Sequence, residues 1–210
     1  MTVTIFGATG TVGKQLITIC LAKGWRVKAF GRNMENLLDK DLRTENFEAI
    51  KGYVFDEKEV RHAIEDSDGV LSVLGGAFDG TDKARSLGIK NIIGQMEATH
   101  VKRIVALGGK GCLQNEDGEY LMDAKDYPEE YKPVGNEHRQ AYLYLKASST
   151  DWTFVCSPDI LPKDADNHFT TLSEKPAPGN QINAGNLALF MAEELEQQKF
   201  IKQRVGISNL

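Results

Sequence analysis

The sequence has no apolar run that approaches the roughly 18 residues of a membrane-spanning helix, and it has no block of consecutive basic residues. Its 25 lysines and arginines are outnumbered by 30 aspartates and glutamates, which gives a formal net charge of -5 at pH 7. A negative chain does not attract the phosphates of nucleic acid or of anionic lipids. We therefore expect neither a nucleic-acid nor a membrane partner.

Cysteine is also scarce. Cys20, Cys112 and Cys156 form an odd, scattered set without the spacing of a metal site, and such thiols are typical of a reducing compartment. Residues 1–6 have neither the basic start nor the longer apolar stretch of a cleaved signal peptide. We expect a cytoplasmic protein without a bound metal.

Short runs with strand character alternate with longer helical stretches along most of the chain. This alternation is typical of a doubly wound, parallel α/β sheet that is covered by helices on both faces. For 210 residues with 41% hydrophobic composition, we expect a single domain over residues 1–210, with a small C-terminal lid on the substrate side. The expected strands are 3–6, 26–30, 49–54, 69–74, 103–107, 153–156 and 204–207, and the expected helices are 11–23, 33–42, 57–64, 81–99, 135–147 and 184–198.

Two segments interrupt the alternation. Residues 108–133 are rich in Gly, Asp, Glu and Tyr, and residues 157–181 contain four prolines. Long irregular segments in a compact domain are usually lids or binding loops. Both segments would follow the C-terminal ends of strands, where open α/β sheets bind ligands. We therefore place the substrate pocket between them.

The most informative motif is a glycine turn. Gly7, Gly10 and Gly13 stand between the expected strand 3–6 and the expected helix 11–23. Glycine lets the backbone approach a pyrophosphate closely, and the helix N-terminus adds N–H groups and a positive dipole end. The spacing differs from the commonest Gly-x-Gly-x-x-Gly fingerprint. Its place between a first strand and a first helix nevertheless predicts a dinucleotide site in a Rossmann-type sheet.

The second expected strand ends without the acid that usually binds the ribose 2′-hydroxyl of NAD. It is followed instead by Gly31 and Arg32. A guanidinium suits a 2′-phosphate, because it donates charge-assisted hydrogen bonds to it. Such a contact corresponds to a preference of about tenfold to hundredfold. We expect NADP(H) to be preferred and NAD(H) to be accepted as well; a solvated arginine at a strand end is the alternative.

Together these motifs resemble the atypical short-chain dehydrogenase/reductase superfamily of NAD(P)H-binding proteins. Within it the chain is most similar to the NADH-flavin reductase group, whose relatives include biliverdin reductase B and NmrA-like proteins. The resemblance extends over nearly the whole chain. The segments that carry it are 5–10, 31–33, 70–76, 106–113, 126–131, 150–158 and 182–188.

The resemblance implies a continuous cofactor path along the strand ends. Residues 74–76 would pass beneath the adenosine side, and residues 107–109 would follow the nicotinamide ribose. Residues 157 and 158 would close over the nicotinamide. The expected cofactor-binding residues are Gly7, Thr9, Gly10, Thr11, Val12, Gly13, Arg32, Tyr53, Val54, Leu74, Gly75, Gly76, Leu107, Gly108, Gly109, Ser157 and Pro158.

One apparent catalytic pair does not fit the family pattern. Tyr142 and Lys146 have the Tyr-x-x-x-Lys spacing of the dehydrogenases, in which the tyrosine donates a proton and the lysine lowers its pKa. Lys146, however, stands too close to the sixth expected strand. Matching the segment 150–153 to the family places Gly135 and Arg139 at the dyad positions instead. We interpret the spacing of Tyr142 and Lys146 as coincidental.

Few other titratable side chains stand out. His138 is a weak catalytic candidate, as a proton donor near neutral pH, but we expect a solvated histidine instead. Its neighbour Glu137 is expected to be a surface carboxylate at a helix start. His168, in the proline-rich segment, is expected to be polar surface.

The acceptor is inferred from what the chain lacks. Reduction of a ketone gives an alkoxide that needs a placed acid, whereas a reduced flavin or quinone is a stabilised anion that water can protonate. Gly108 and Gly109 stand where many relatives have a serine or threonine, so the chain fits the second case. We expect a reductase for a small flavin-like or quinone-like acceptor, as a monomer or weak homodimer. Candidate residues for the acceptor face are Leu113, Tyr120, Tyr127 and Phe169.

Two alternatives remain open. An NmrA-like regulatory protein would bind NAD(P) without turnover and would lack the same catalytic groups. A sugar-nucleotide epimerase would need the Tyr/Lys dyad and a larger C-terminal domain than 210 residues leave room for.

Overall fold

A large sheet forms the centre of the protein in the computed structural model, which describes residues 1–37 and 45–210. Its strands are β1 (Thr2–Phe6), β2 (Arg26–Gly31), β3 (Phe47–Lys51), β4 (Gly69–Ser72), β5 (Arg103–Gly109), β6 (Asp151–Ser157), β8 (Phe169–Ser173) and β10 (Gln203–Asn209). They lie in the order β3-β2-β1-β4-β5-β6-β10-β8, with every neighbouring pair parallel except β10 and β8. The order reverses between β1 and β4, and open α/β sheets bind ligands at such a point.

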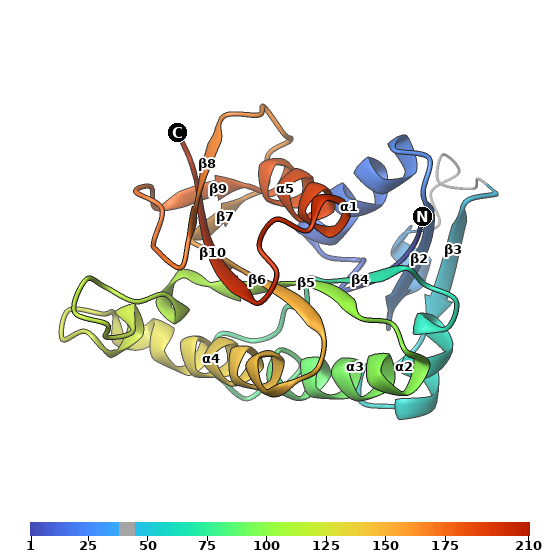
Figure 1. The fold of residues 1–210 in the computed structure, drawn as a ribbon, viewed down its shortest axis with the longest axis horizontal. Helices are drawn as coiled ribbons and strands as arrows, with labels where there is room; N and C mark the ends of the chain where they lie inside the picture. The colour runs from blue at the N-terminus through green and yellow to red at the C-terminus, as the bar shows by residue number, and fades with distance from the viewer. Residues whose placement is uncertain (38–44) are drawn as a thin grey trace.

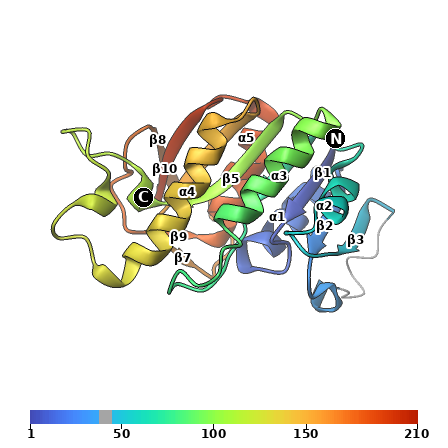
Figure 2. The ribbon, with the colours of Figure 1, turned by 90° about the horizontal axis from the view of Figure 1, so that it is seen from below.

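Helices cover both faces of this sheet. They are α1 (Thr11–Ala22), α2 (Glu57–Ile64), α3 (Ser86–Thr99), α4 (Lys132–Ala147) and α5 (Ala184–Gln197). α1 and α5 pack together on one face, and α2, α3 and α4 lie in a row on the other (Figures 1 and 2). The doubly wound α/β fold is thereby confirmed.

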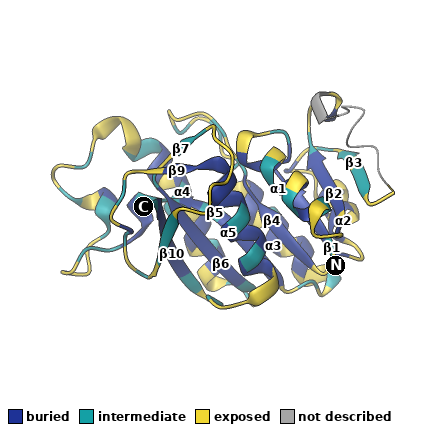
Figure 3. Ribbon diagram, turned by 90° about the horizontal axis from the view of Figure 1, so that it is seen from above, coloured by how far each residue is buried: buried dark blue, intermediate teal, exposed yellow. Residues whose placement is uncertain are grey.

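The strands are apolar on both sides because both sides are covered. In β1, Val3 and Ile5 belong to the core beneath α1 and α5, whereas Phe6 belongs to the core beneath α2, α3 and α4. Figure 3 shows the consequence: the central strands are buried, and exposed residues gather in the connecting loops.

Two expected elements near the first half of the sheet differ from the structure. β3 ends at Lys51, so Tyr53 and Val54 follow the strand instead of ending it. The expected helix 33–42 begins as a short 3-10 helix, η1 (Met34–Leu37), and the rest of it lies outside the described residues.

The expected helix 81–99, which is α3 in the structure, begins later than expected, at Ser86. The carboxylate of Asp79 accepts a hydrogen bond from the backbone N–H of Thr81. Asp82 accepts one from the N–H of Ala84 in the same way. These side-chain hydrogen bonds hold the backbone in turns and compete with helical hydrogen bonds. The helix therefore begins only at Ser86.

The expectation of an irregular segment at 157–181 is wrong. β7 (Asp159–Leu161) pairs in parallel with β9 (Gln181–Asn183) to form a small second sheet, and β8 extends the central sheet. The other irregular segment begins later than expected, because β5 continues to Gly109. It contains the 3-10 helices η3 (Lys110–Cys112), η4 (Leu121–Asp123) and η5 (Glu129–Tyr131).

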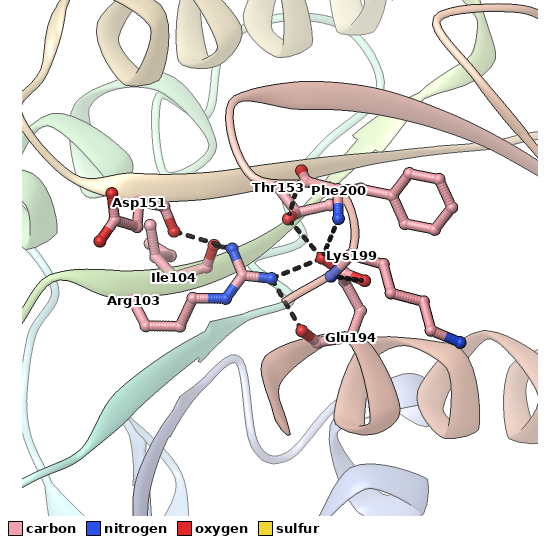
Figure 4. Close-up of polar contacts among 7 residues, drawn as sticks. All are labelled: Arg103, Ile104, Asp151, Thr153, Glu194, Lys199 and Phe200. Atoms are coloured by element: carbon pink, nitrogen blue, oxygen red, sulfur yellow. Dashed lines mark hydrogen bonds and ion pairs between the residues drawn. The ribbon is translucent and has the colours of Figure 1, made fainter. Parts of the chain in front are cut away.

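A buried ion pair joins the sheet to the last helix (Figure 4). Nη2 of Arg103, on β5, donates to Oε1 of Glu194 at 2.7 Å and to its backbone carbonyl at 2.8 Å. The same carboxylate accepts hydrogen bonds from the hydroxyl of Thr153 and from the N–H of Phe200. The pair therefore links β5, β6, α5 and the turn that leads into β10.

Candidate functional site

A cleft of about 1690 Å³ lies at the C-terminal edge of the sheet. Its walls are the segments that follow β1, β2, β3, β4, β5 and β6. The structure brings all of the expected cofactor-binding residues together along this cleft, although their role in binding stays a prediction. They are Gly7, Thr9, Gly10, Thr11, Val12, Gly13, Arg32, Tyr53, Val54, Leu74, Gly75, Gly76, Leu107, Gly108, Gly109, Ser157 and Pro158.

The glycine turn is packed so tightly that side chains are excluded from it. Gly7 has φ of +82°, and a Cβ there would lie 2.4 Å from the carbonyl oxygen of Val73. A Cβ on Gly13 would lie 2.3 Å from the carbonyl oxygen of Gly7. Glycine at these two positions thus lets β1, α1 and the end of β4 approach one another closely.

The N-terminus of α1 faces the cleft without a side-chain cap. Gly10 is the N-cap residue, and no side chain there accepts a hydrogen bond. The first N–H groups of a helix have no partner within the helix. With the positive end of the helix dipole, they form a place for a pyrophosphate or another anion.

The end of the cleft that is expected to hold the adenosine combines a cation with aromatic side chains. Arg32 is exposed directly after β2, and the rings of Tyr53 and Phe55 meet edge to face with centroids 5.0 Å apart. Asp56 and Glu59 have the spacing of a capping box at the start of α2, and this box is half formed. Asp56 accepts from the N–H of Glu59, but the Glu59 carboxylate accepts from the N–H of Tyr53 at 2.7 Å and so fixes the turn at the cleft edge.

A buried arginine holds the loop between β4 and α3. Arg85 donates to the carbonyl oxygens of Gly76 at 2.9 Å and of Ala77 at 3.0 Å. Burial lowers the pKa of its guanidinium, and the charges of Asp82 and Glu137 partly offset this effect. Arg85 thereby shapes the cleft wall at Gly76, a role that the sequence pattern does not reveal.

The two glycines at the end of β5 are set by their packing partners. They continue the ladder to β6, where Gly108 pairs with Cys156. A Cβ on Gly108 would lie 2.2 Å from the ring of Phe154, and one on Gly109 would lie 3.0 Å from Cδ2 of His138. A serine or threonine at position 108 would therefore require Phe154 to move.

His138 lines the cleft and is neutral at physiological pH. Burial, and secondly the positive charge of Arg85, lower the pKa of its imidazole to about 3. Its Nδ1 is buried and has no hydrogen-bond partner among the described residues. The imidazole is half-buried, so the expectation of a solvated histidine is wrong. Its low pKa also argues against a role as proton donor near pH 7.

Glu137 is buried, which corrects the expectation of a surface carboxylate. It accepts hydrogen bonds from Oγ of Ser86 at 2.5 Å and from Nζ of Lys83 at 2.8 Å. These contacts tie the start of α4 to the start of α3. Their role is therefore to hold the cleft wall together.

Tyr142 and Lys146 lie outside the cleft, as expected for a coincidental spacing. The Tyr142 ring is buried, with the Trp152 ring centroid at 5.8 Å and the Arg204 guanidinium at 5.0 Å from its own centroid. Lys146 is exposed. At the family's dyad positions, Gly135 lines the cleft and Arg139 forms an ion pair with Asp123 at 2.9 Å.

The structure brings only part of the expected acceptor face to the cleft. Of its four candidates, Tyr127 lines the cleft, while Leu113, Tyr120 and Phe169 lie elsewhere. Leu113 is fully buried in the core. His168 is exposed and lies outside the cleft, as expected. Lining residues that the sequence pattern did not single out are Lys110, Pro128, Tyr131, Val134, Ile160 and Asn180.

The described residues contain neither a metal-binding cluster nor a membrane-spanning helix. In the described part of the chain, no three or more His, Cys, Asp or Glu side chains are placed to hold a metal ion. Helices long and apolar enough to span a bilayer are likewise absent from residues 1–37 and 45–210.

Known protein structures share the fold of this chain. Among solved structures, a "putative epimerase" from Bacteroides thetaiotaomicron has a TM-score of 0.86 at 26% identity and covers 100% of this chain and 97% of its own. A "putative NADH-flavin reductase" from Streptococcus pneumoniae TIGR4 has a TM-score of 0.85 at 23% identity, with 100% of both chains covered.

The sequence comparisons extend the same similarity. YwnB of Bacillus subtilis (strain 168) is 24% identical over 158 residues, which are 74% of this chain and 70% of that protein. Residues 7–198 match the family described as NAD(P)H-binding. Because this match includes most of the chain, the protein belongs to the NAD(P)H-binding family, as the resemblance of its motifs predicts.

Proposed function

We propose that the protein is an NAD(P)H-dependent reductase that transfers hydride to a flat acceptor such as a flavin or a quinone. The observation that carries this proposal is the continuity of the cleft. It runs from the glycine turn at Gly7, past Gly108 and Gly109, to Tyr127 and Ile160. A dinucleotide held at the turn would leave room beyond Gly109 for a stacked acceptor. Proximity and orientation are what hydride transfer between flat rings mainly requires.

The chain's own groups would hold the cofactor at three points. The free N–H groups at the start of α1 suit the pyrophosphate, and the guanidinium of Arg32 suits a 2′-phosphate. Gly108 and Gly109 line the cleft and would leave the backbone accessible to the nicotinamide ribose. When bound, the nicotinamide supplies the hydride.

The titratable groups favour an acceptor that needs no protein acid. His138 is neutral, since the pKa of its imidazole is lowered to about 3, and Tyr142 lies outside the cleft. A reduced flavin or quinone can be protonated by water. The name of the structurally similar Streptococcus pneumoniae protein, which includes NADH-flavin reductase, supports the same class of acceptor.

The test is steady-state oxidation of NADPH with FMN, riboflavin and menadione as acceptors, corrected for the reaction without protein. We expect saturable turnover with at least one of these acceptors. A Gly13→Val variant serves as the control, since its side chain would collide with the backbone of Gly7 and should remove the activity. Tight NADPH binding without oxidation by any acceptor would contradict the proposal and favour the NmrA-like regulatory protein.

A further inference from the structure

Lys110 stands at the acceptor end of the cleft. It follows Gly109 directly at the end of β5, and its half-buried side chain lines the cleft together with Asn180. Its Nζ donates to the backbone oxygen of Gly179 at 3.0 Å and to Oδ1 of Asn180 at 3.0 Å. These contacts hold the ammonium in place between β5 and the loop that precedes β9.

The partners of this ammonium are neutral. Two other lysines near the cleft have carboxylate partners: Lys83 pairs with Glu137, and Lys132 pairs with Glu129. Lys110 forms no ion pair within the described residues. An ammonium has three N–H donors, and two of those of Lys110 are used. One donor and a full positive charge thus remain at a partly desolvated position.

The surroundings leave this charge without a compensating group. Burial lowers the pKa of the Lys110 ammonium, and no carboxylate of residues 1–37 and 45–210 opposes the effect. Asp126 and Asp159 also line the cleft, but neither forms an ion pair with Lys110. A desolvated cation that is held by dipoles interacts strongly with an anion that approaches it.

We infer that Lys110 binds an anionic substituent of the acceptor, a phosphate or a carboxylate, and so makes the protein selective for anionic flat acceptors. The inference rests on the proposed function, because it places the acceptor beyond Gly109. The ammonium donates its third N–H to the anion while Gly179 and Asn180 keep it oriented. Lys110 is therefore a specificity residue, not a participant in hydride transfer.

The experiment is equilibrium binding of FMN and riboflavin to the NADP⁺-saturated protein, followed by flavin fluorescence. The two flavins share one ring system and differ in the phosphate. We expect FMN to bind about tenfold to hundredfold more tightly than riboflavin, the range for one charge-assisted contact. Lys110→Met should remove that difference by weakening FMN alone, and Lys110→Arg should retain most of it. Lys125→Met, an exposed lysine outside the cleft lining, should leave both affinities unchanged.

Further measurements identify the anion and distinguish a failure of this inference from a failure of the proposed function. A carboxylated quinone compared with its neutral methyl ester shows whether a carboxylate is bound as well as a phosphate. Equal binding of anionic and neutral acceptors by the wild type would overturn the inference. A Lys110→Met variant that weakens FMN and riboflavin equally would also overturn it, since Lys110 would then only hold the loop. Lys110-dependent FMN binding without NADPH oxidation would leave the anion site standing and refute the reductase.

Discussion

The histidine at the cleft behaves unlike most histidines, which titrate between pH 5 and 8. Burial and the charge of Arg85 lower the pKa of His138 to about 3, while the unfolded chain binds this proton near pH 6.5. Between these pH values the unfolded state carries the extra proton. The stability contribution of neutral His138 is therefore complete above pH 6.5 and is lost as the pH falls toward 3.

We predict that the free energy of unfolding of the wild type falls more steeply below pH 6.5 than that of His138→Asn. The difference in slope is at most about 1.4 kcal/mol per pH unit, and the partial exposure of the ring reduces it. Urea unfolding at pH 7, 6 and 5 measures it. His62→Asn, which changes an exposed histidine, is the control. Parallel curves for wild type and His138→Asn would show that His138 is not held neutral.

A second residue-scale prediction concerns the choice of cofactor. Arg32→Ser should raise the KM for NADPH by about tenfold to hundredfold, because one charge-assisted contact to the 2′-phosphate is lost. The KM for NADH should change little. Arg26→Ser is the matched control, since Arg26 is exposed at the opposite end of β2 and pairs with Glu48. Equal KM values for the two cofactors in the wild type would refute the preference.

At this scale the sequence predicts backbone sites better than side-chain sites. The positions of Gly7 and Gly13 follow from a local rule that links a strand, a turn and a helix. Lys110 acts through Gly179, which is distant in the sequence, and Arg85 reaches back across an irregular loop to Gly76. Such partners become neighbours only when the loops pack, so no local pattern could indicate them.

Among the helices, two glycines should respond to alanine in opposite directions. Gly13 lies in α1 with the backbone oxygen of Gly7 2.3 Å from its ideal Cβ, whereas Gly94 is exposed in α3 with nothing within 4 Å. Gly94→Ala should stabilise the protein by about 0.5–1 kcal/mol through helix propensity. Gly13→Ala should destabilise it by about 1–3 kcal/mol through overpacking.

Urea unfolding of these two variants measures both changes in the free energy of unfolding, and NADPH binding gives a second readout. Gly13→Ala should also weaken NADPH, because the turn must open to admit the methyl group, while Gly94→Ala should bind it normally. Stabilisation by Gly13→Ala would mean that the turn is looser than its 2.3 Å approach indicates.

Helices and strands are predicted more accurately when they are longer and when a capping residue marks where they begin. α2 begins and ends as predicted, since Asp56 supplies a cap for Lys58 and Glu59. β7 and β9 have three residues each, too few to show a periodicity. They pair with each other across about 20 residues of chain, and such a pairing is a property of the folded loop.

At the scale of the whole molecule, a buried ion pair connects the middle of the sheet to α5 and to the turn before β10. Arg103 on β5 and Glu194 on α5 are both almost fully buried, and Figure 4 shows that their contacts reach Thr153 and Phe200. Phe200 precedes β10, the strand that joins β8 to β6. A charge left alone here costs more than the pair itself contributes, because burial disfavours an unpaired ion strongly.

We therefore predict that Arg103→Met lowers the free energy of unfolding by about 3–5 kcal/mol. The double variant Arg103→Met/Glu194→Gln should recover more than half of the loss, since glutamine is neutral and its Oε1 can still accept from Thr153 and Phe200. Urea unfolding measures both, with Arg26→Met as the exposed-arginine control. A double variant as unstable as Arg103→Met would show that the guanidinium acts through its backbone contacts to Asp151 and Glu194 instead of through the charge of the pair.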